Sequence, residues 1–369
     1  MSRGLGDVYK RQQIRKIFKA SRIIGRRFKL VHVFNRSELI EVATFRSGEN
    51  KENDGNLVTD RTGKILRDNI WGTLEQDTFR RDFTVNALYY CPVSKKIEDH
   101  NSGIKHIRDK KIVSIGDPIK RFSEDPVRSL RAIRFSNKLQ FKIDSKIKDA
   151  IYKQGHLLSH ISNARLFDEF CKIFLNGIAE KNFKKLESYG LNQYLILTNP
   201  NDTIFSSELI KEALRNTDKR FGENKSITPG FLIAAMLWPE LIKRASKNDE
   251  INLRKFFRSM DLVLKNQQNI TAIPRKFHTY IKDIWILQLK LHSRIGKQPY
   301  KTLKHPRFRA AYDFLLIREK ASKCKPDLGS WWTKFQKNDP SSQKSLISNL
   351  RELTEEQSFK KFGFPEELI

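Results

Sequence analysis

Two stretches rich in arginine and carboxylate decide how this sequence is interpreted. The first stretch is Asp77–Leu88, DTFRRDFTVNAL, and the second is Glu124–Phe135, EDPVRSLRAIRF. Arginine is suited to planar, two-pronged contacts with phosphates or base edges, and a nearby Asp can fix its orientation. We therefore expect the two stretches to form one site that handles a phosphorylated ligand carrying a base.

The second stretch also carries the signals of a helix start. Asp125 can cap a helix, and Pro126 fits the first helical position. Three arginines then recur at every third position, on one side of the helix: Arg128, Arg131 and Arg134. A solvated basic face and a plain helix cap would give the same spacing, so the pattern alone leaves both interpretations open.

The charge of the chain favours a polyanionic partner. The 369 residues include 71 Lys and Arg against 42 Asp and Glu, a net charge of +29. Such an excess attracts nucleic acid or anionic membrane surfaces, although a protein that is merely basic remains an alternative. No apolar run approaches the roughly 18 residues that a membrane span needs. The three cysteines are scattered and no zinc-type spacing occurs, so we expect a reduced, cytoplasmic protein.

Alternating patterns predict strands in the first third of the chain. Residues Arg26–Phe34 and Leu39–Phe45 alternate on either side of a short turn, which indicates a β-hairpin. Glu41 lies on the opposite face from its apolar neighbours in the second strand, where an exposed strand carboxylate is the plain alternative to a functional one. A further strand is expected at Ala87–Val93.

Beyond Pro118 the pattern becomes helical, and about 250 residues follow without strand signals. Segments Phe231–Trp238 and Ile281–Leu287 are apolar enough to predict buried helices. Glycines and prolines interrupt the pattern, and we expect one helix to stop at Pro239. The sequence therefore predicts a small α/β part followed by a long all-helical part.

The two stretches resemble motifs of the class II nucleotidyltransferases, the bacterial poly(A) polymerases and CCA-adding enzymes. The first is similar to the nucleotide-binding motif of that family and the second to its base-recognition motif. The similarity runs from about Gln13 to Trp332. It implies an α+β fold, with a partial DNA polymerase beta-type nucleotidyltransferase head followed by a long all-α neck and body that bind RNA. The implied segments are an unmatched leader at 1–12, the head at 13–117, the neck at 118–200, the body at 201–335 and a polar tail at 336–369.

The C-terminal half indicates the subgroup. Segments Asp283–Leu289 and Leu303–Asp313 resemble bacterial poly(A) polymerases more than CCA-adding enzymes. This resemblance implies template-independent addition of AMP from ATP to RNA 3′ ends, with Mg²⁺ as cofactor, in mRNA processing and decay. The alternatives are a CCA-adding tRNA nucleotidyltransferase and a non-catalytic RNA-binding relative. Protein partners are not indicated.

The resemblance also implies roles for single residues. Glu41 would be a catalytic carboxylate near the metals. Triphosphate and ribose would be bound from the first stretch, by Asp77, Arg80, Arg81, Asp82 and Asn86. The incoming base would be read from the second stretch, by Glu124, Asp125 and Arg128, with Arg131 and Arg134 supporting that edge or binding phosphate.

One part of the family pattern is missing. The Asp-x-Asp that holds two magnesium ions in the family occurs nowhere in these 369 residues. The leader at 1–12 stands where that motif would precede Gln13, so we expect an N-terminally truncated chain that is inactive or nearly so. His106 also stands where the family more often has Asp, which affects a predicted hinge turn.

Overall fold

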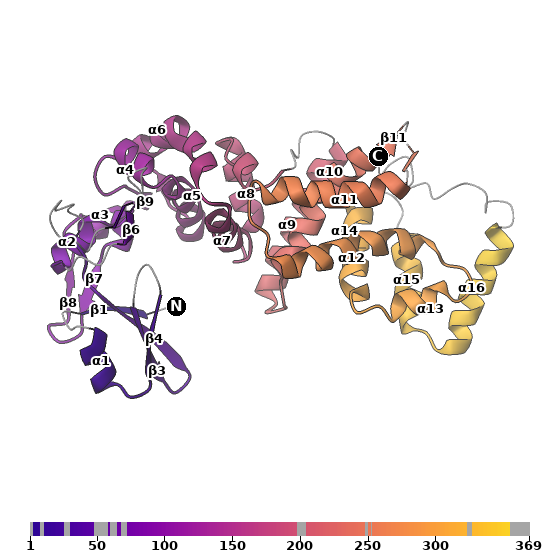
Figure 1. Cartoon of the computed structure of the whole chain (residues 1–369), viewed down its shortest axis with the longest axis horizontal. Helices are drawn as coiled ribbons and strands as arrows, with labels where there is room; N and C mark the ends of the chain where they lie inside the picture. Colours follow the sequence, from indigo (N-terminus) through magenta and orange to yellow (C-terminus); the bar gives the residue numbers. More distant parts are fainter. Residues whose placement is uncertain are drawn as a thin grey trace. The chain divides into compact units, whose positions relative to one another are not determined.

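The computed structural model describes residues 3–7, 11–25, 30–47, 58–59, 65–67, 72–197, 204–247, 250–251, 253–322 and 327–354. It divides into two compact units. Unit 1 comprises residues 1–128 and 139–150, and unit 2 comprises 129–138 and 151–369. Figure 1 colours the chain from its N-terminus to its C-terminus and labels its helices and several of its strands. The α+β class is confirmed, since the strands of the head precede a long series of helices.

A four-stranded sheet opens unit 1, in the order β1 (Arg3–Asp7), β4 (Glu38–Thr44), β3 (Leu30–Asn35) and β2 (Ser21–Ile24). Strands β3 and β4 form the predicted antiparallel hairpin. Strand β1 pairs parallel with β4, in a segment where the sequence shows no strand periodicity. Helix α1 (Arg11–Ile17) contributes Ile14 to a small core with residues of β3 and β4.

The second half of unit 1 carries the motif residues on short elements. These are α2 (Leu74–Phe79), the 3₁₀ turn η1 (Thr84–Asn86), β7 (Tyr89–Cys91), β8 (Lys96–Glu98), α3 (Gly103–Arg108), β9 (Lys111–Ile112), α4 (Pro118–Glu124) and β10 (Lys142–Ile143). Two further short strands, β5 (Val58–Thr59) and β6 (Ile65–Arg67), pair with each other. Strand β7 confirms the strand expected at 87–93.

The predicted helix start at Asp125–Pro126 is followed by a helix at Val127, and a further helix, α4, precedes it. Asp117 caps α4 by accepting hydrogen bonds from the backbone N–H groups of Ile119 and Lys120, and Pro118 occupies its first turn. Asp125 ends α4, and α5 (Val127–Leu139) follows directly. The boundary between the two units falls within α5.

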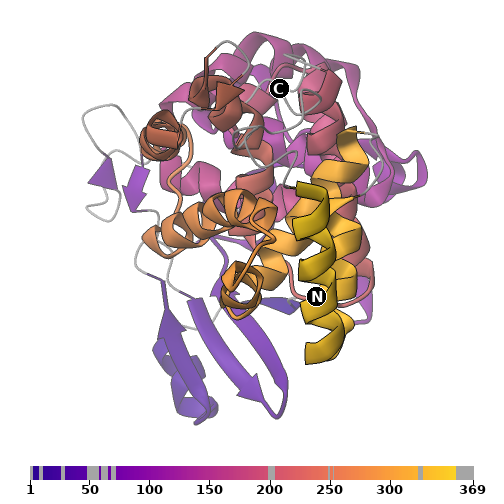
Figure 2. The ribbon, with the colours of Figure 1, turned by 90° about the vertical axis from the view of Figure 1, so that its right-hand side faces the viewer.

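Unit 2 is built almost entirely of helices, which Figure 2 shows from the side. Helix α6 (Ser145–Gln154) passes from unit 1 into unit 2 at residue 151. The elements that follow in unit 2 are η2 (Gly155–His160), α7 (Asn163–Phe174), α8 (Ala179–Ser188), η3 (Asn192–Tyr194), α9 (Ile204–Gly222), α10 (Pro229–Ala245), α11 (Leu253–Gln268), α12 (Arg275–His292), α13 (Gln298–Leu303), α14 (Phe308–Ser322), α15 (Leu328–Lys337) and α16 (Pro340–Thr354). A two-stranded ribbon, β11 (Ser246–Lys247) and β12 (Glu250–Ile251), joins α10 to α11. No described helix has the length and apolarity that crossing a bilayer would require.

Helices α10 and α12 form the predicted buried centre of unit 2. The indole N–H of Trp285 on α12 donates to the carbonyl of Ala234 on α10, at 2.9 Å. The prediction that a helix stops at Pro239 is wrong, because α10 continues through it to Ala245. An interior proline costs a helix about 3 kcal/mol. Here the burial of α10 against α9, α11 and α12 offsets that cost.

The C-terminal helices form a second aromatic core. Trp332 on α15 is fully buried and donates its indole N–H to the carbonyl of Leu291, at 2.9 Å. Helix α16 lies in the segment predicted as a polar tail, yet its Ile347 is buried in this cluster. Part of that segment is therefore packed, while the domain boundaries implied by the resemblance stay predictions.

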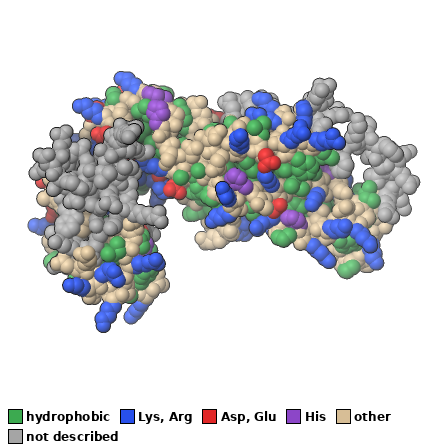
Figure 3. Space-filling view, in the orientation of Figure 1, with side chains coloured by type: hydrophobic (Ala, Val, Ile, Leu, Met, Phe, Trp, Pro, Cys, Tyr) green, Lys and Arg blue, Asp and Glu red, His purple; other side chains and the backbone are tan. Residues whose placement is uncertain are grey.

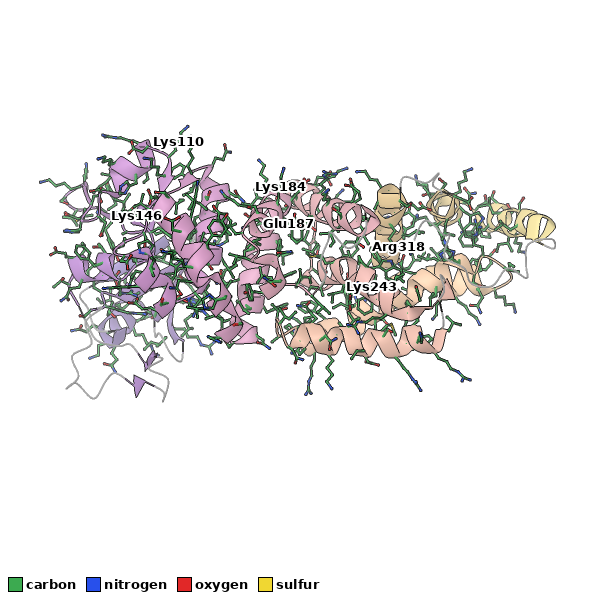
Figure 4. All side chains as sticks on the ribbon, turned by 90° about the horizontal axis from the view of Figure 1, so that it is seen from above. Lys110, Lys146, Lys184, Glu187, Lys243 and Arg318 are labelled. Carbon is green, nitrogen blue, oxygen red and sulfur yellow. The ribbon has the colours of Figure 1, made fainter. Side chains whose placement is uncertain are left out.

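A buried arginine lies within unit 2. Arg318 on α14 is 1% exposed, donates from Nη1 to Oε1 of Gln288 at 2.9 Å, and lies over the ring of Trp238. Figure 4 shows it among the helices, and it also labels Lys184, which is exposed on α8. Burial lowers the pKa of Arg318 to about 9.

Candidate nucleotide-binding site

Helix α2 places the Asp77 carboxylate inside unit 1. Thr73 and Gln76 form a capping box at its start, with Gln76 N donating to Thr73 Oγ1 at 3.2 Å and Thr73 N donating to Gln76 Oε1 at 2.9 Å. This fixed start turns the Asp77 side chain, which is 3% exposed, away from solvent. A buried carboxylate must be paired or hydrogen-bonded to stay ionised.

Asp77 is held by donors on both oxygens. Oδ1 accepts from the backbone N–H of Arg46 at 3.2 Å and from Nε of Arg80 at 2.7 Å. Oδ2 accepts from Nε and Nη2 of Arg81, at 3.2 and 3.1 Å, and from the Tyr89 hydroxyl. Burial would raise the pKa of Asp77, but the Tyr89 hydrogen bond and the two arginines outweigh it and hold that pKa below its usual value.

The Arg81 guanidinium donates to three residues of the site. Besides Asp77, it donates from Nη1 to the carbonyl of Asn86 at 3.0 Å and from Nη2 to the Tyr89 hydroxyl at 2.6 Å. Burial and the hydrogen bond to Asp77 raise the pKa of Tyr89 to about 12, so this hydroxyl stays protonated. Both arginine side chains are partly exposed, Arg80 at 29% and Arg81 at 36%, but Arg80 contacts fewer groups, because Asp77 is the one side chain that its guanidinium contacts among the described residues. Arg80 is thus the better placed of the two to contact a ligand.

Asp82 and Asn86 shape the turn that follows. Oδ1 of Asp82 accepts from the backbone N–H of Phe83 at 2.8 Å and from Nδ2 of Asn86 at 3.1 Å. The carbonyl of Asn86 in turn holds Arg81. On the other side of this turn, Thr84 Oγ1 lies 3.0 Å from Nδ1 of His106, the residue that departs from the family pattern.

Arg121, which the sequence argument does not single out, joins the two motif stretches. Its Nη2 donates to the carbonyls of Arg80 and Arg81, at 2.7 and 2.8 Å, and its Nη1 donates to Glu124 at 3.1 Å. Arg128 donates from Nη1 to the carbonyl of Arg121 at 3.2 Å and lies 3.7 Å from Glu124. Burial, followed by the charge of Arg121, lowers the pKa of Arg128.

Four further predicted residues, Glu41, Asp125, Arg131 and Arg134, lie on other elements or at the end of α4. Glu41 on β4 is paired across the hairpin with His32, with Nε2 and Oε1 3.4 Å apart, and its side chain is 38% exposed. Arg131 and Arg134 belong to unit 2, where their guanidinium carbons lie 5.6 and 4.3 Å from the ring centre of Phe135. The backbone carbonyl of Asp125 accepts from the N–H of Arg128 at 3.0 Å.

The described residues do not fit the two-metal site that the family resemblance implies. Within the part of the chain that the structure describes, no three His, Cys, Asp or Glu side chains gather as metal ligands would. The pair Glu75-x-Asp77 has the same spacing as the missing Asp-x-Asp, but it does not replace that motif as a metal site. Both oxygens of Asp77 already accept hydrogen bonds from protein donors.

Two residues of this network were missed by the sequence argument. Tyr89 gives no signal, because its contact with Asp77 joins a helix to a strand. Arg121 could have been found, since Arg121, Glu124 and Arg128 follow the i, i+3, i+7 spacing of one helical face. The end of α4 at Asp125 interrupts that helix, yet the three side chains still meet.

Comparison with known proteins gives family matches along most of the chain. Residues 7–113 match the poly A polymerase head domain, 140–200 a probable RNA and SrmB-binding site of polymerase A, and 249–362 the polymerase A arginine-rich C-terminus. Poly(A) polymerase I of Escherichia coli O157:H7 is 40% identical over 359 residues, covering 92% of this chain and 76% of that protein. The Haemophilus influenzae enzyme is 38% identical, covering 93% and 78%.

CCA-adding enzymes match less of the sequence but share the fold. That of Anoxybacillus flavithermus is 34% identical over 200 residues, or 54% of this chain and 47% of that protein. The crystal structure of the Bacillus stearothermophilus CCA-adding enzyme in complex with CTP has a TM-score of 0.57 at 20% identity, covering 96% of this chain and 73% of that chain. A tRNA nucleotidyltransferase complexed with a primer tRNA and an incoming ATP analog has a TM-score of 0.55 at 17% identity, covering 93% and 86%.

Proposed function

This chain belongs to the bacterial poly(A) polymerase family, and we infer from that membership that its reaction is the addition of AMP from ATP to RNA 3′ ends. The observation that carries this inference is the 38–40% identity to poly(A) polymerase I over more than nine-tenths of the chain. Bacterial ATP and RNA 3′ ends are cytoplasmic, so a cytoplasmic location is part of the proposal.

Arg80 is the residue that we propose for contact with the triphosphate. Its guanidinium is oriented by the buried Asp77 and remains partly exposed. In phosphoryl transfer the protein mainly positions the reactants and neutralises charge, which an oriented arginine does well. Asp77 and Arg81 then act as positioning residues, since their polar atoms are engaged with each other, Tyr89 and Asn86.

Arg128 and Asp125 are proposed to select adenine, with Glu124 fixing Arg128. The geometry supports the part of this proposal that concerns Arg128. Its guanidinium lies 3.7 Å from Glu124 and donates to the carbonyl of Arg121 in α4. Paired donors and acceptors on a base edge discriminate by about 1–3 kcal/mol per contact. Asp82 and Asn86 are proposed to face the ribose from the turn at η1, and Arg131 and Arg134 to support the base or bind phosphate.

RNA binding is proposed for the helices of unit 2. The segment 140–200 matches the family's probable RNA-binding site. Lys and Arg side chains are spread over the face shown in Figure 3, and acidic side chains are few on it. A net charge of +29 supplies the electrostatic attraction that dominates binding to phosphate backbones.

The chemistry itself needs carboxylates that this sequence does not contain. Mg²⁺ is proposed as cofactor from the family resemblance, although the described residues do not supply a set of ligands for it. Glu41 is proposed as one carboxylate of the metal site, but no Asp-x-Asp accompanies it. We therefore expect this polypeptide to bind ATP and RNA while extending RNA slowly or not at all.

A chimera tests the proposed function. Placing the N-terminal segment of the Escherichia coli relative ahead of Gln13, up to the residue aligned with it, should support extension of an RNA oligonucleotide with ATP alone. Extension that requires CTP and stops after a short CCA end would instead show a CCA-adding enzyme. A chimera that binds RNA, but extends it with neither nucleotide, would favour the non-catalytic relative.

A further inference from the structure

Arg121 donates hydrogen bonds to the backbone carbonyls at the C-terminal end of helix α2. Its Nη2 donates to the carbonyls of Phe79, Arg80 and Arg81, at 3.5, 2.7 and 2.8 Å. Carbonyls at the end of a helix lack partners within the helix and carry partial negative charge, so a guanidinium satisfies them well. This contact fixes the turn that carries Arg80 and Arg81, although Arg121 lies about 40 residues away in the sequence.

The same residue holds the start of the second motif. Nη1 of Arg121 donates to Oε2 of Glu124 at 3.1 Å, and that carboxylate lies 3.7 Å from Nη1 of Arg128. The carbonyl of Arg121 accepts from Nη1 of Arg128 at 3.2 Å and from the backbone N–H of Asp125 at 3.2 Å. Every one of these contacts lies within unit 1.

We propose that Arg121 is a positioning residue that couples the base-reading side chains Asp125 and Arg128 to the triphosphate-binding turn at Arg80–Arg81. The Arg121 guanidinium contacts the carbonyls of that turn and the Glu124 carboxylate, and its backbone carbonyl accepts from Arg128, so a shift of either motif moves the other. A correct base against Arg128 then holds Arg80 in place for the triphosphate, and a wrong base does not. This inference rests on the proposed function, since it needs a nucleotide in that site.

Lysine cannot replace Arg121 in this role. The guanidinium is planar and presents separate N–H groups to two carbonyls and a carboxylate, whereas an ammonium is a single point on a flexible stem. The side chain of Arg121 is 19% exposed, which leaves little room for a mobile substitute to find the same partners.

The test is the preference of the chain for ATP over CTP, measured as the ratio of dissociation constants by equilibrium dialysis. Arg121→Gln keeps the carbonyl to which Arg128 donates, so it removes the link through the side chain alone. We expect this variant to lower the preference about tenfold, within the range for a lost base contact. Arg121→Lys should recover less than half of that loss on a logarithmic scale. Arg108→Gln, which changes an exposed arginine of α3, should alter nothing.

A double-mutant cycle separates coupling from mere structural support. In an Arg128→Gln background, Arg121→Gln should change the preference by less than about twofold, because the residue it positions is already gone. An equal loss of affinity for both nucleotides, or an unchanged preference, would overturn the inference.

The wild-type chain tests the proposed function separately. A wild-type preference for CTP would contradict adenylate selection, yet coupling would still predict that Arg121→Gln weakens that preference. A wild type without any preference would contradict both.

Discussion

The Tyr89 hydroxyl donates a hydrogen bond to Oδ2 of Asp77, the same oxygen that accepts two hydrogen bonds from Arg81. Tyr89, a residue of strand β7, thus contributes a hydrogen bond to a buried carboxylate on helix α2, 12 residues earlier in the chain. Because Arg81 also donates to the Tyr89 hydroxyl, the three side chains form a closed ring of hydrogen bonds. This ring sets the direction of the neighbouring Arg80.

Replacing Asp77 by Asn should damage both stability and nucleotide binding. The change removes the charge that orients Arg80 and Arg81. Because these two side chains are about one-third exposed, water partly replaces the interaction that they lose. We expect a loss of about 1–3 kcal/mol in the free energy of unfolding and about tenfold in ATP affinity. Asp109→Asn, at an exposed position of unit 1, is the control. Unchanged ATP affinity in a folded Asp77→Asn variant would contradict the positioning role.

Tyr89→Phe removes the hydroxyl and leaves the ring in place. Since the Tyr89 hydroxyl serves Asp77 and Arg81, its loss should lower the free energy of unfolding by about 1–2 kcal/mol, measured by urea denaturation. Tyr90→Phe is a matched control, because Tyr90 is the next residue and is 61% exposed. Equal effects of the two substitutions would show that the hydroxyl ring does not contribute to stability.

The lowered pKa of Asp77 predicts an acid-dependent contribution to stability. A carboxylate whose folded pKa lies below its unfolded value stabilises the protein above the unfolded pKa, and this contribution fades as pH falls through the folded pKa. The difference in unfolding free energy between wild type and Asp77→Asn should therefore be constant near neutrality and shrink below pH 3.8. A difference that grows on acidification would mean that the Asp77 pKa is raised.

Tyr152 is expected to contribute to RNA binding in unit 2. Its ring is 66% exposed and lies 5.2 Å from the ring of Tyr189, within the segment that matches the probable RNA-binding site. Bases stack on such exposed rings with about 1–3 kcal/mol each. Tyr152→Ala should weaken binding of single-stranded RNA about tenfold or more, and Tyr152→Phe should retain it. Loss of affinity in both variants would exclude stacking as the cause.

Local patterns predicted the elements whose signals lie within a few residues. The hairpin of β3 and β4 follows from alternation, and the buried α10 and α12 follow from their apolar runs. The same Asp-Pro signal occurs at Asp117–Pro118, and it marks the start of α4. The prediction that a helix stops at Pro239 was wrong because it considered the proline alone. A proline breaks an isolated helix, but α10 is packed against three other helices and continues through it.

Contacts between distant segments could not be predicted in the same way. Strand β1 pairs with β4 across more than 30 residues, and its register depends on the sheet rather than on its own sequence. Asp77, Arg80 and Arg81 of the first motif lie together in the structure, and the ligand contacts proposed for them stay predictions. The motifs did not reveal that Tyr89 completes the group or that Arg121 ties it to Arg128.

The most direct test of the account is the binding of ATP and CTP to this chain by equilibrium dialysis, without RNA. We expect ATP to bind more tightly than CTP and Arg128→Gln to remove the difference. Equal binding of both nucleotides, or tighter binding of CTP, would contradict the assignment of this site to adenylate addition.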